Sequence, residues 1–393
     1  MTRLEILRRG YLAPFQCAFR NLIYASGFLG CFGFSGAMMF FTFDLGAQGF
    51  FVLFSFFASR FISGNVIFMQ LYLFLLHRFR GPKALFALIA LGTIGSAASY
   101  SLLVLPQGSL LYALLSGFLF SMVSAGFWSL HHAAMTIYTS DQNIGNEIAI
   151  CGIFDSIGSA MGFLAGGLVL AAGFSSGFAL FFTTMLLASV CLALSLRGMK
   201  QTADVKPYNP IEKIKNGCPK RTGMTLFHGA VQFFSSFAAP VWLGMLGAKS
   251  AFAGFLMSLN IVLQFLVSPV IGHLFHQQKE QEVKIGAAFL TAGWLPLLIF
   301  QKALLYPLSS VLWMVGDNML HVGTISRWYK SRDLADVAAR ELLLGAGRFG
   351  ACALALPILF YGSPFLFFLL AGCVCGGAFL IFIRPAPEIL PAE

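Results

Sequence analysis

The chain has 393 residues, of which 58% are hydrophobic and 10% are charged, and its mean hydropathy is +0.82. About a quarter of the residues in an average soluble protein are charged, so this composition excludes a soluble globular protein. We expect an all-α polytopic membrane protein embedded in a lipid bilayer. The formal net charge is +10, but no glycine-rich phosphate loop, zinc-type Cys/His spacing or basic–aromatic patch accompanies it. We therefore expect no nucleic-acid partner, no metal and no cofactor.

Twelve apolar segments are long enough to cross a bilayer, which takes about 20 residues of helix. The first begins shortly after the basic N-terminal sequence MTRLEILRRG and is too long for the apolar region of a signal peptide, about 7–15 residues, so we expect an uncleaved first helix. In chain order the predicted spans are 21–43, 49–76, 84–105, 109–137, 146–172, 176–196, 223–246, 250–275, 285–301, 306–328, 339–361 and 364–383.

One long polar interruption divides these spans into two sets of six. It runs from Arg197 to Thr222, is basic and contains three prolines. We therefore predict an N-terminal six-helix bundle over 1–196, a central loop over 197–222 and a C-terminal six-helix bundle over 223–393.

The two predicted bundles also share a local pattern. The sequence LHHAAMTIYTSDQNIGNEIAICG starts at Leu130, and LHVGTISRWYKSRDLADVAARELLLG starts at Leu320. Each has a Leu-His near the end of the fourth span of its half, then a polar loop and a glutamate, Glu147 or Glu341. This pattern predicts an internal repeat with pseudo-symmetric bundles, which is common in secondary transporters.

The basic residues predict an orientation. Of the 25 lysines and arginines, only Lys249 and Lys302 fall in loops on one side, while Arg60 and Arg348 fall inside spans. The remainder lie on the other side, which the positive-inside rule assigns to the cytoplasm. We expect both termini and the central loop to be cytoplasmic, in a cell inner membrane.

Ionisable residues are distributed unevenly among the spans. The third, sixth, ninth and twelfth contain none, whereas four charges, Arg60, Asp155, Asp317 and Arg348, fall near the middle of other spans. Charged groups within a membrane face the protein interior. Guanidinium keeps its charge and binds carboxylate or phosphate with two hydrogen bonds, so we predict that Arg60 and Arg348 contact an anionic or zwitterionic substrate. The alternative is a structural ion pair with Asp155 or Asp317.

Helical i, i+4 spacing places polar side chains on shared faces. Asp317 shares a face with His321, and a carboxylate beside an imidazole suits proton coupling. We predict that Asp317, His321 and Asp155 couple protons to transport. His228 shares a face with Gln232, and Gln232 joins the predicted substrate site.

Two adjacent histidines, His131 and His132, lie near the end of the fourth span. Adjacent helical residues point about 100° apart, so the two rarely bind one metal ion. We therefore predict a gating or packing role for His131.

Two motifs resemble those of the major facilitator superfamily. The loop after the second span, LFLLHRFRGPKAL, keeps Arg78 of the superfamily's loop motif, with His77 in place of its acidic residue. The fifth span, GSAMGFLAGGL, is similar to the superfamily's antiporter motif, with a phenylalanine in place of its proline. Its matching glycines are Gly158, Gly162, Gly166 and Gly167.

This resemblance implies two bundles that rock around a central site to give alternating access. It also implies gating roles for His77, Arg78 and the four glycines. No catalytic motif such as H-E-x-x-H or G-x-S-x-G is present, so we expect no enzyme.

Three functional interpretations remain open. The first is a monomeric, proton-coupled secondary transporter of a small organic solute. The second is a multidrug/proton antiporter that exports apolar compounds, which the glycines of the fifth span and the many aromatic residues favour. The third is a membrane receptor or scaffold on the same fold that transports nothing.

Overall fold

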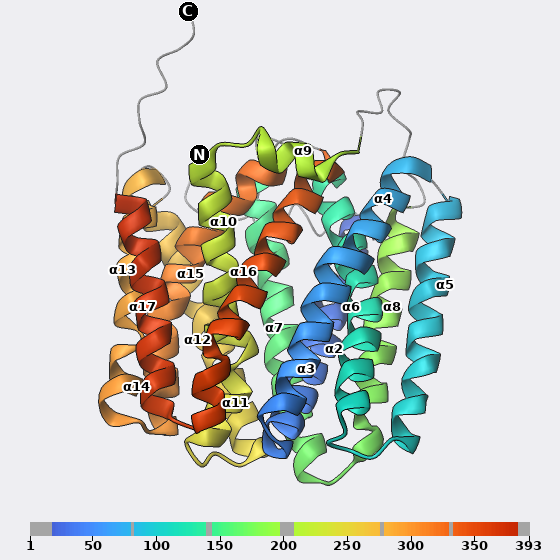
Figure 1. Cartoon of the computed structure of the whole chain (residues 1–393). Helices are drawn as coiled ribbons and strands as arrows, with labels where there is room; N and C mark the ends of the chain where they lie inside the picture. Colours follow the sequence, from blue (N-terminus) through green and yellow to red (C-terminus); the bar gives the residue numbers. More distant parts are fainter. Residues whose placement is uncertain are drawn as a thin grey trace, which may run out of the picture.

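A computed structural model describes residues 18–79, 82–138, 144–196, 208–275, 279–329 and 333–383. Every regular element within these ranges is helical, and most of the helices run alongside one another (Figure 1). Seven described segments are long and apolar enough to cross a membrane, and four shorter apolar helices accompany them. The prediction of an all-α polytopic membrane protein is confirmed.

The helices follow the predicted spans closely. In the first half the spans correspond to α2 (Ala18–Gln48), α3 and α4 (Phe50–Phe61 and Met69–Phe79), α5 (Pro82–Ala98), α6 (Leu110–Tyr138), α7 (Ile144–Ala171) and α8 (Phe178–Leu196). In the second half they correspond to α10 and α11 (Pro219–Gln232 and Ala239–Met245), α12 (Ser250–Phe275), α13 and α14 (Lys279–Ala292 and Leu295–Phe300), α15 (Tyr306–Tyr329), α16 (Leu334–Tyr361) and α17 (Pro364–Ile383).

The predicted central loop contains a short helix that the sequence analysis missed. Helix α9 (Pro210–Lys215) lies across one end of the bundle, shown in yellow-green in Figure 1. The Asn209 side chain accepts a hydrogen bond from the backbone N–H of Glu212 at 3.1 Å, and Pro210 occupies the first turn. Both features are helix-start signals. We call this end of the molecule the α9 end.

Two helices are interrupted by a wider turn near the middle of the bundle. Between α3 and α4 lies the π-helical segment η3 (Ile62–Phe68), which begins two residues after Arg60. Between α10 and α11 lies η6 (Phe233–Phe237), which begins directly after Gln232. Segments of π-helix occur frequently at functional sites. Both interruptions adjoin residues that the sequence predicted for the substrate site.

The glycines of α7 allow very close helix packing. A Cβ atom at Gly158 or Gly162 would overlap a backbone carbonyl oxygen of α2, and one at Gly166 would crowd another. A Cβ at Gly167 would crowd the start of α12, in the other half of the chain. The predicted gating glycines are therefore positions where α7 contacts both halves.

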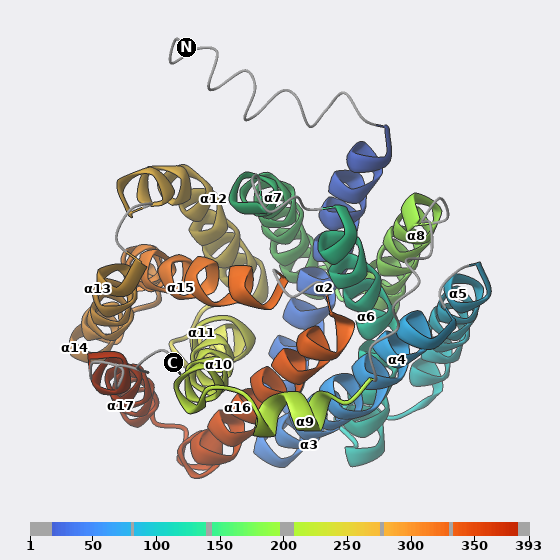
Figure 2. The ribbon, with the colours of Figure 1, turned by 90° about the horizontal axis from the view of Figure 1, so that it is seen from above.

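The two halves meet along several helices. Figure 2, viewed from the α9 end, shows α9 above α16, with α16 beside α3 and α4. Helix α7 packs against α12, and α2 packs against α11. The candidate site described below lies where α3, α10, α15 and α16 approach one another.

Candidate functional site

Arg60 is enclosed by aromatic rings. Its guanidinium carbon lies 4.6 to 5.5 Å from the ring centroids of Phe34, Phe61, Phe120 and Phe237, and the residue is only 6% exposed. Within the described residues no carboxylate pairs with Arg60, and its Nε atom has no hydrogen-bond partner. Cation–π contacts of about 0.5–2 kcal/mol each offset part of the cost of burying this charge. Among the described residues no ion pair joins Arg60 to Asp155 or Asp317, the alternative that the sequence left open; both carboxylates instead contact histidines.

Arg348 heads a chain of polar contacts that joins three helices. Its Nη2 donates a hydrogen bond to Oε1 of Gln232 at 2.6 Å. The Nε2 of Gln232 lies 3.3 Å from Nε2 of His228, which lies 2.8 Å from Oδ1 of Asp317. The chain therefore runs from α16 through α10 to α15.

Hydrogen-bonding chemistry fixes the orientation of the Gln232 amide. Arginine can only donate, so the oxygen of the amide must face Arg348 and its NH2 group must face His228. The 2.8 Å contact between His228 and Asp317 then holds a proton between the two groups, because two acceptors would repel. The side chain of Asp317 is 28% exposed and that of His228 is 2% exposed.

Asp317 has a partner that the sequence analysis did not assign to it, His228 of α10. The predicted partner on its own helix, His321, has a side chain outside the described set, so that pairing stays a prediction. The i, i+4 spacing of His228 and Gln232 was the available sequence signal, but sequence alone does not bring α10 to α15.

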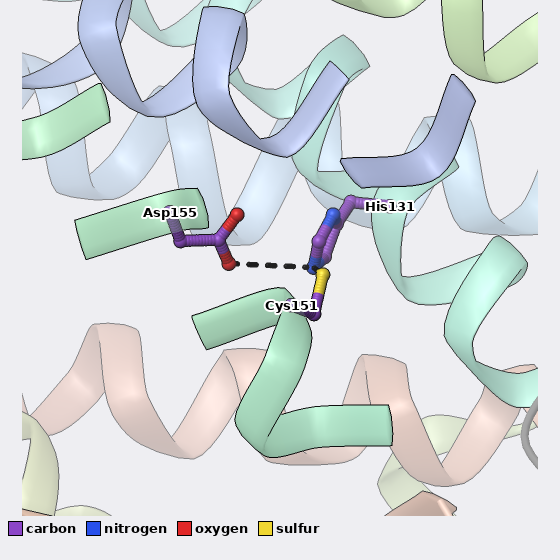
Figure 3. A group of neighbouring side chains, drawn as sticks. All are labelled: His131, Cys151 and Asp155. Carbon is purple, nitrogen blue, oxygen red and sulfur yellow. Dashed lines mark hydrogen bonds and ion pairs between the residues drawn. The ribbon is translucent and has the colours of Figure 1, made fainter. Parts of the chain in front are cut away.

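Asp155 lies elsewhere. Its Oδ2 is 3.9 Å from Nε2 of His131, and the same imidazole nitrogen lies 4.0 Å from Sγ of Cys151 (Figure 3). Asp155 is therefore grouped with a thiol and an imidazole. The four mid-membrane charges do not form one cluster.

A second set of contacts joins the two halves nearer the α9 end. His132 Nε2 of α6 lies 3.5 Å from Oε1 of Glu341 on α16. Asn65 donates to the Glu341 backbone carbonyl, and Gln70 donates to that of Ala338, both at 3.1 Å. These contacts hold η3, α4 and α6 against α16.

The segment 208–215, which we call the strap, covers this junction. The Tyr208 hydroxyl donates to the Gln70 backbone carbonyl at 3.2 Å, and the rings of Tyr208 and His77 lie 5.3 Å apart. Lys213 lies 2.8 Å from Asp333 and 3.7 Å from Asp336 at the start of α16. His77 thus contacts the strap, whereas Arg78 is exposed.

No protein-family model and no curated protein matches the chain. Solved structures do match, at low sequence identity. The human organic anion transporter MFSD10 is 13% identical with a TM-score of 0.66, over 93% of this chain and 100% of that one. The E. coli xylose transporter XylE is 13% identical with a TM-score of 0.64, over 94% and 97%. The nucleoside transporter NupG, in a mutant form, is 14% identical with a TM-score of 0.62, over 93% and 100%.

These similarities show that the chain has the fold of major facilitator superfamily transporters, as the sequence motifs predicted. All three structures are described as transporters.

Proposed function

We propose that this protein is a proton-coupled secondary transporter of a small organic anion or zwitterion, working by alternating access. The observation that carries the proposal is the continuous chain Asp317–His228–Gln232–Arg348. It connects a titratable pair to a guanidinium group within a fold whose solved examples include an organic anion transporter. Arg60 supplies a second permanent positive charge close to the end of this chain.

The row of polar contacts from Asp317 to Arg348 gives a physical route by which a proton can influence substrate binding. Two described side chains, Asp317 and Gln232, contact the Nε2 atom of His228. That nitrogen is either a donor or an acceptor, so it can make a good hydrogen bond with only one of them at a time. When Nε2 carries the proton, it donates to Asp317 and no longer accepts from the Gln232 amide. When Nε2 is bare, it accepts either from the Gln232 NH2 group or from a protonated Asp317.

The substrate half of the proposal follows from the two arginines. Both guanidinium groups keep their charge, and no described carboxylate neutralises Arg60. A carboxylate or phosphate that entered beside Phe237 would satisfy the free Nε donors of Arg60 and Arg348. A change at Gln232 alters the orientation of Arg348, so the protonation state biases the affinity for the anion.

The test begins with a thermal-shift screen of the purified protein against carboxylates, phosphates, amino acids and apolar compounds. A ligand of the folded state raises the unfolding midpoint. We expect hits among the anions and zwitterions. Hits confined to apolar compounds would favour the multidrug antiporter, which the phenylalanines around Arg60 would also suit.

The coupling role is tested with that ligand in proteoliposomes. We expect Asp317→Asn to retain exchange of labelled for unlabelled substrate but to lose accumulation driven by a pH gradient. Asp44→Asn is the matched control, because Asp44 is an acidic residue of α2 that makes no part of the contacts from Asp317 to Arg348. Wild-type accumulation by Asp317→Asn would remove the coupling role, and a protein that moves no solute at all would indicate a scaffold.

The proposal also places the α9 end in the cytoplasm of a cell whose inner membrane holds the protein. Cys218 is exposed beside the strap, so an impermeant thiol reagent should label it only after the cells are opened. Labelling of Cys218 in intact cells would reverse the orientation.

A further inference from the structure

Three potential metal ligands converge between α6 and α7. Cys151 and Asp155 are one helical turn apart on α7, and His131 faces them from α6 (Figure 3). One donor atom from each residue lies within 4.8 Å of the other two. This is the one such group of histidine, cysteine and acidic residues among the residues described.

Two of the three donor separations are close to those around a bound ion, and the third, between Cys151 and Asp155, is at most 4.8 Å. Zinc binds imidazole nitrogen at about 2.0–2.1 Å, carboxylate oxygen at about 2.0–2.2 Å and thiolate sulfur at about 2.3 Å, so its tetrahedral ligands lie roughly 3.3–3.7 Å apart. The N–O and N–S separations in the structure are 3.9 and 4.0 Å. Side-chain movements of a few tenths of an ångström would bring both into the bonding range.

The polar atoms of the group are poorly satisfied by the protein. Among the described residues the only ion-pair partner of Asp155 is His131, and its Oδ1 atom has no hydrogen bond. His131 is 5% exposed, and its Nδ1 atom is also without a partner. The side chain of Asp155 is 23% exposed, but its Oδ1 atom is buried, and buried charged groups are normally paired, a carboxylate with a cation, or bound to a metal. Neither arginine of the candidate site supplies that cation.

Helix α2 closes the remaining side of the group. A Cβ atom at Gly27 would overlap the Asp155 carboxylate, so glycine lets α2 approach it closely. One turn further along α2 lies Cys31, a buried free cysteine. A second thiol therefore lies beside the three donors.

We propose that His131, Cys151 and Asp155 bind a divalent transition metal of the zinc class and thereby tie α6 to α7. Thiolate and imidazole ligands suit zinc and cobalt, whereas magnesium and calcium prefer sites built of oxygen. The sequence analysis expected no metal because His131 and His132 diverge. The proposed site uses only His131 and takes its other ligands from α7. It is independent of the proposed transport function.

Cobalt(II) is a suitable probe because thiolate coordination gives it a near-ultraviolet charge-transfer band. The purified full-length protein, stripped with a chelator, is titrated with cobalt(II) and then with zinc(II). We expect one equivalent of cobalt to bind, to produce that band and to be displaced by zinc. We also expect zinc to raise the unfolding midpoint.

Variants assign the ligands. Cys151→Ser should abolish the band, and Asp155→Asn and His131→Gln should each weaken binding at least tenfold. Cys352→Ser is the matched control, since Cys352 is a buried cysteine of α16 outside the group, and it should bind like the wild type. Absence of the band in the wild-type protein, or its persistence in Cys151→Ser, would overturn the proposal.

A second measurement needs no variant. Zinc should slow alkylation of Cys151 by a membrane-permeant maleimide, mapped by mass spectrometry, without protecting Cys352. Equal alkylation of Cys151 with and without zinc would also overturn the proposal.

Discussion

The guanidinium groups of Arg60 and Arg348 lie over the same ring, that of Phe237, at 4.6 and 5.1 Å from its centroid. Arg60 belongs to the first half of the chain and Arg348 to the second. Phe237 ends the π-helical segment η6, which follows Gln232 directly. One aromatic side chain therefore stands between two like charges at the junction of the halves.

Replacement of Phe237 should remove a cation–π contact from both Arg60 and Arg348. Phe237→Leu removes two cation–π contacts of about 0.5–2 kcal/mol each, so we expect a lower unfolding midpoint and at least tenfold weaker binding of the transported anion. Phe237→Tyr keeps the ring face and should retain most of the affinity.

Phe233→Leu is the matched control. Phe233 is fully buried one turn earlier, and its ring contacts are to other phenylalanines. It should lose stability to a similar degree but keep the anion affinity. Equal losses of affinity in both leucine variants would indicate general packing rather than the arginine contacts.

The two arginines should respond differently to lysine. Lysine places a compact charge at the end of a flexible chain and cannot reproduce the planar fork of guanidinium. We expect Arg60→Lys to lower substrate affinity at unchanged expression and melting temperature, because its aromatic surroundings contain no hydrogen bond to preserve. Arg348→Lys should lose affinity and also shift the pH dependence of uptake, because Arg348 donates to Gln232. Wild-type affinity in Arg60→Lys would leave Arg60 with a structural role alone.

The sequence predicted the helices well because the spans are long, apolar and bounded by polar or glycine-containing turns. It also identified Arg60, Arg348 and Asp317 as interior residues, since a charge inside a membrane span must face protein, and it identified Gln232 from its shared helix face with His228. Their partners depend on how helices are placed relative to one another. Periodicity along one helix can suggest a partner such as His321 for Asp317, but it cannot predict the contact of Asp317 with His228, which lies on another helix.

The aromatic enclosure of Arg60 could not be predicted from the sequence either. Its rings come from α2, α3, α6 and η6, and phenylalanine is so frequent in this chain, at 44 residues, that no position stands out. The strap was missed for a different reason. Its helix is only six residues long, and its start signal at Asn209 is local.

The glycines of α7 give a sharp stability test. A Cβ at Gly158 would overlap the carbonyl oxygen of Phe28, and backbone cannot move aside as a side chain can. We expect Gly158→Ala to lower the free energy of unfolding by about 1–3 kcal/mol or more. Gly152→Ala on the same helix meets nothing within 4 Å and should be neutral or slightly stabilising. Similar unfolding midpoints for both variants, in thermal denaturation in detergent, would contradict the close approach of α7 to α2.

The strap should stabilise the closed conformation at the α9 end. It hydrogen-bonds to α4 through Tyr208 and forms ion pairs with Asp333 and Asp336 near the start of α16 through Lys213. Partly exposed ion pairs contribute about 0.2–1 kcal/mol, so we expect Lys213→Met to increase the open population up to about fivefold. Hydrogen exchange of the amides near Gln70 measures this change. Lys215→Met, at an exposed position of the same helix, is the control and should have no effect.

The stabilisation of the closed α9 end by the strap should depend on pH through Lys213. The hydrogen bond with Asp333 raises the pKa of Lys213 above its usual 10.5. A group whose pKa is raised on folding stabilises the folded contact fully below its unfolded pKa, and the contribution is lost as the pH rises through the folded value. The difference in exchange between wild type and Lys213→Met should therefore be the same at pH 7 and pH 9 and should shrink above pH 10.5. It should also shrink at high salt, which screens exposed charges. A difference that disappeared between pH 7 and pH 9 would show that Lys213 does not carry the contact.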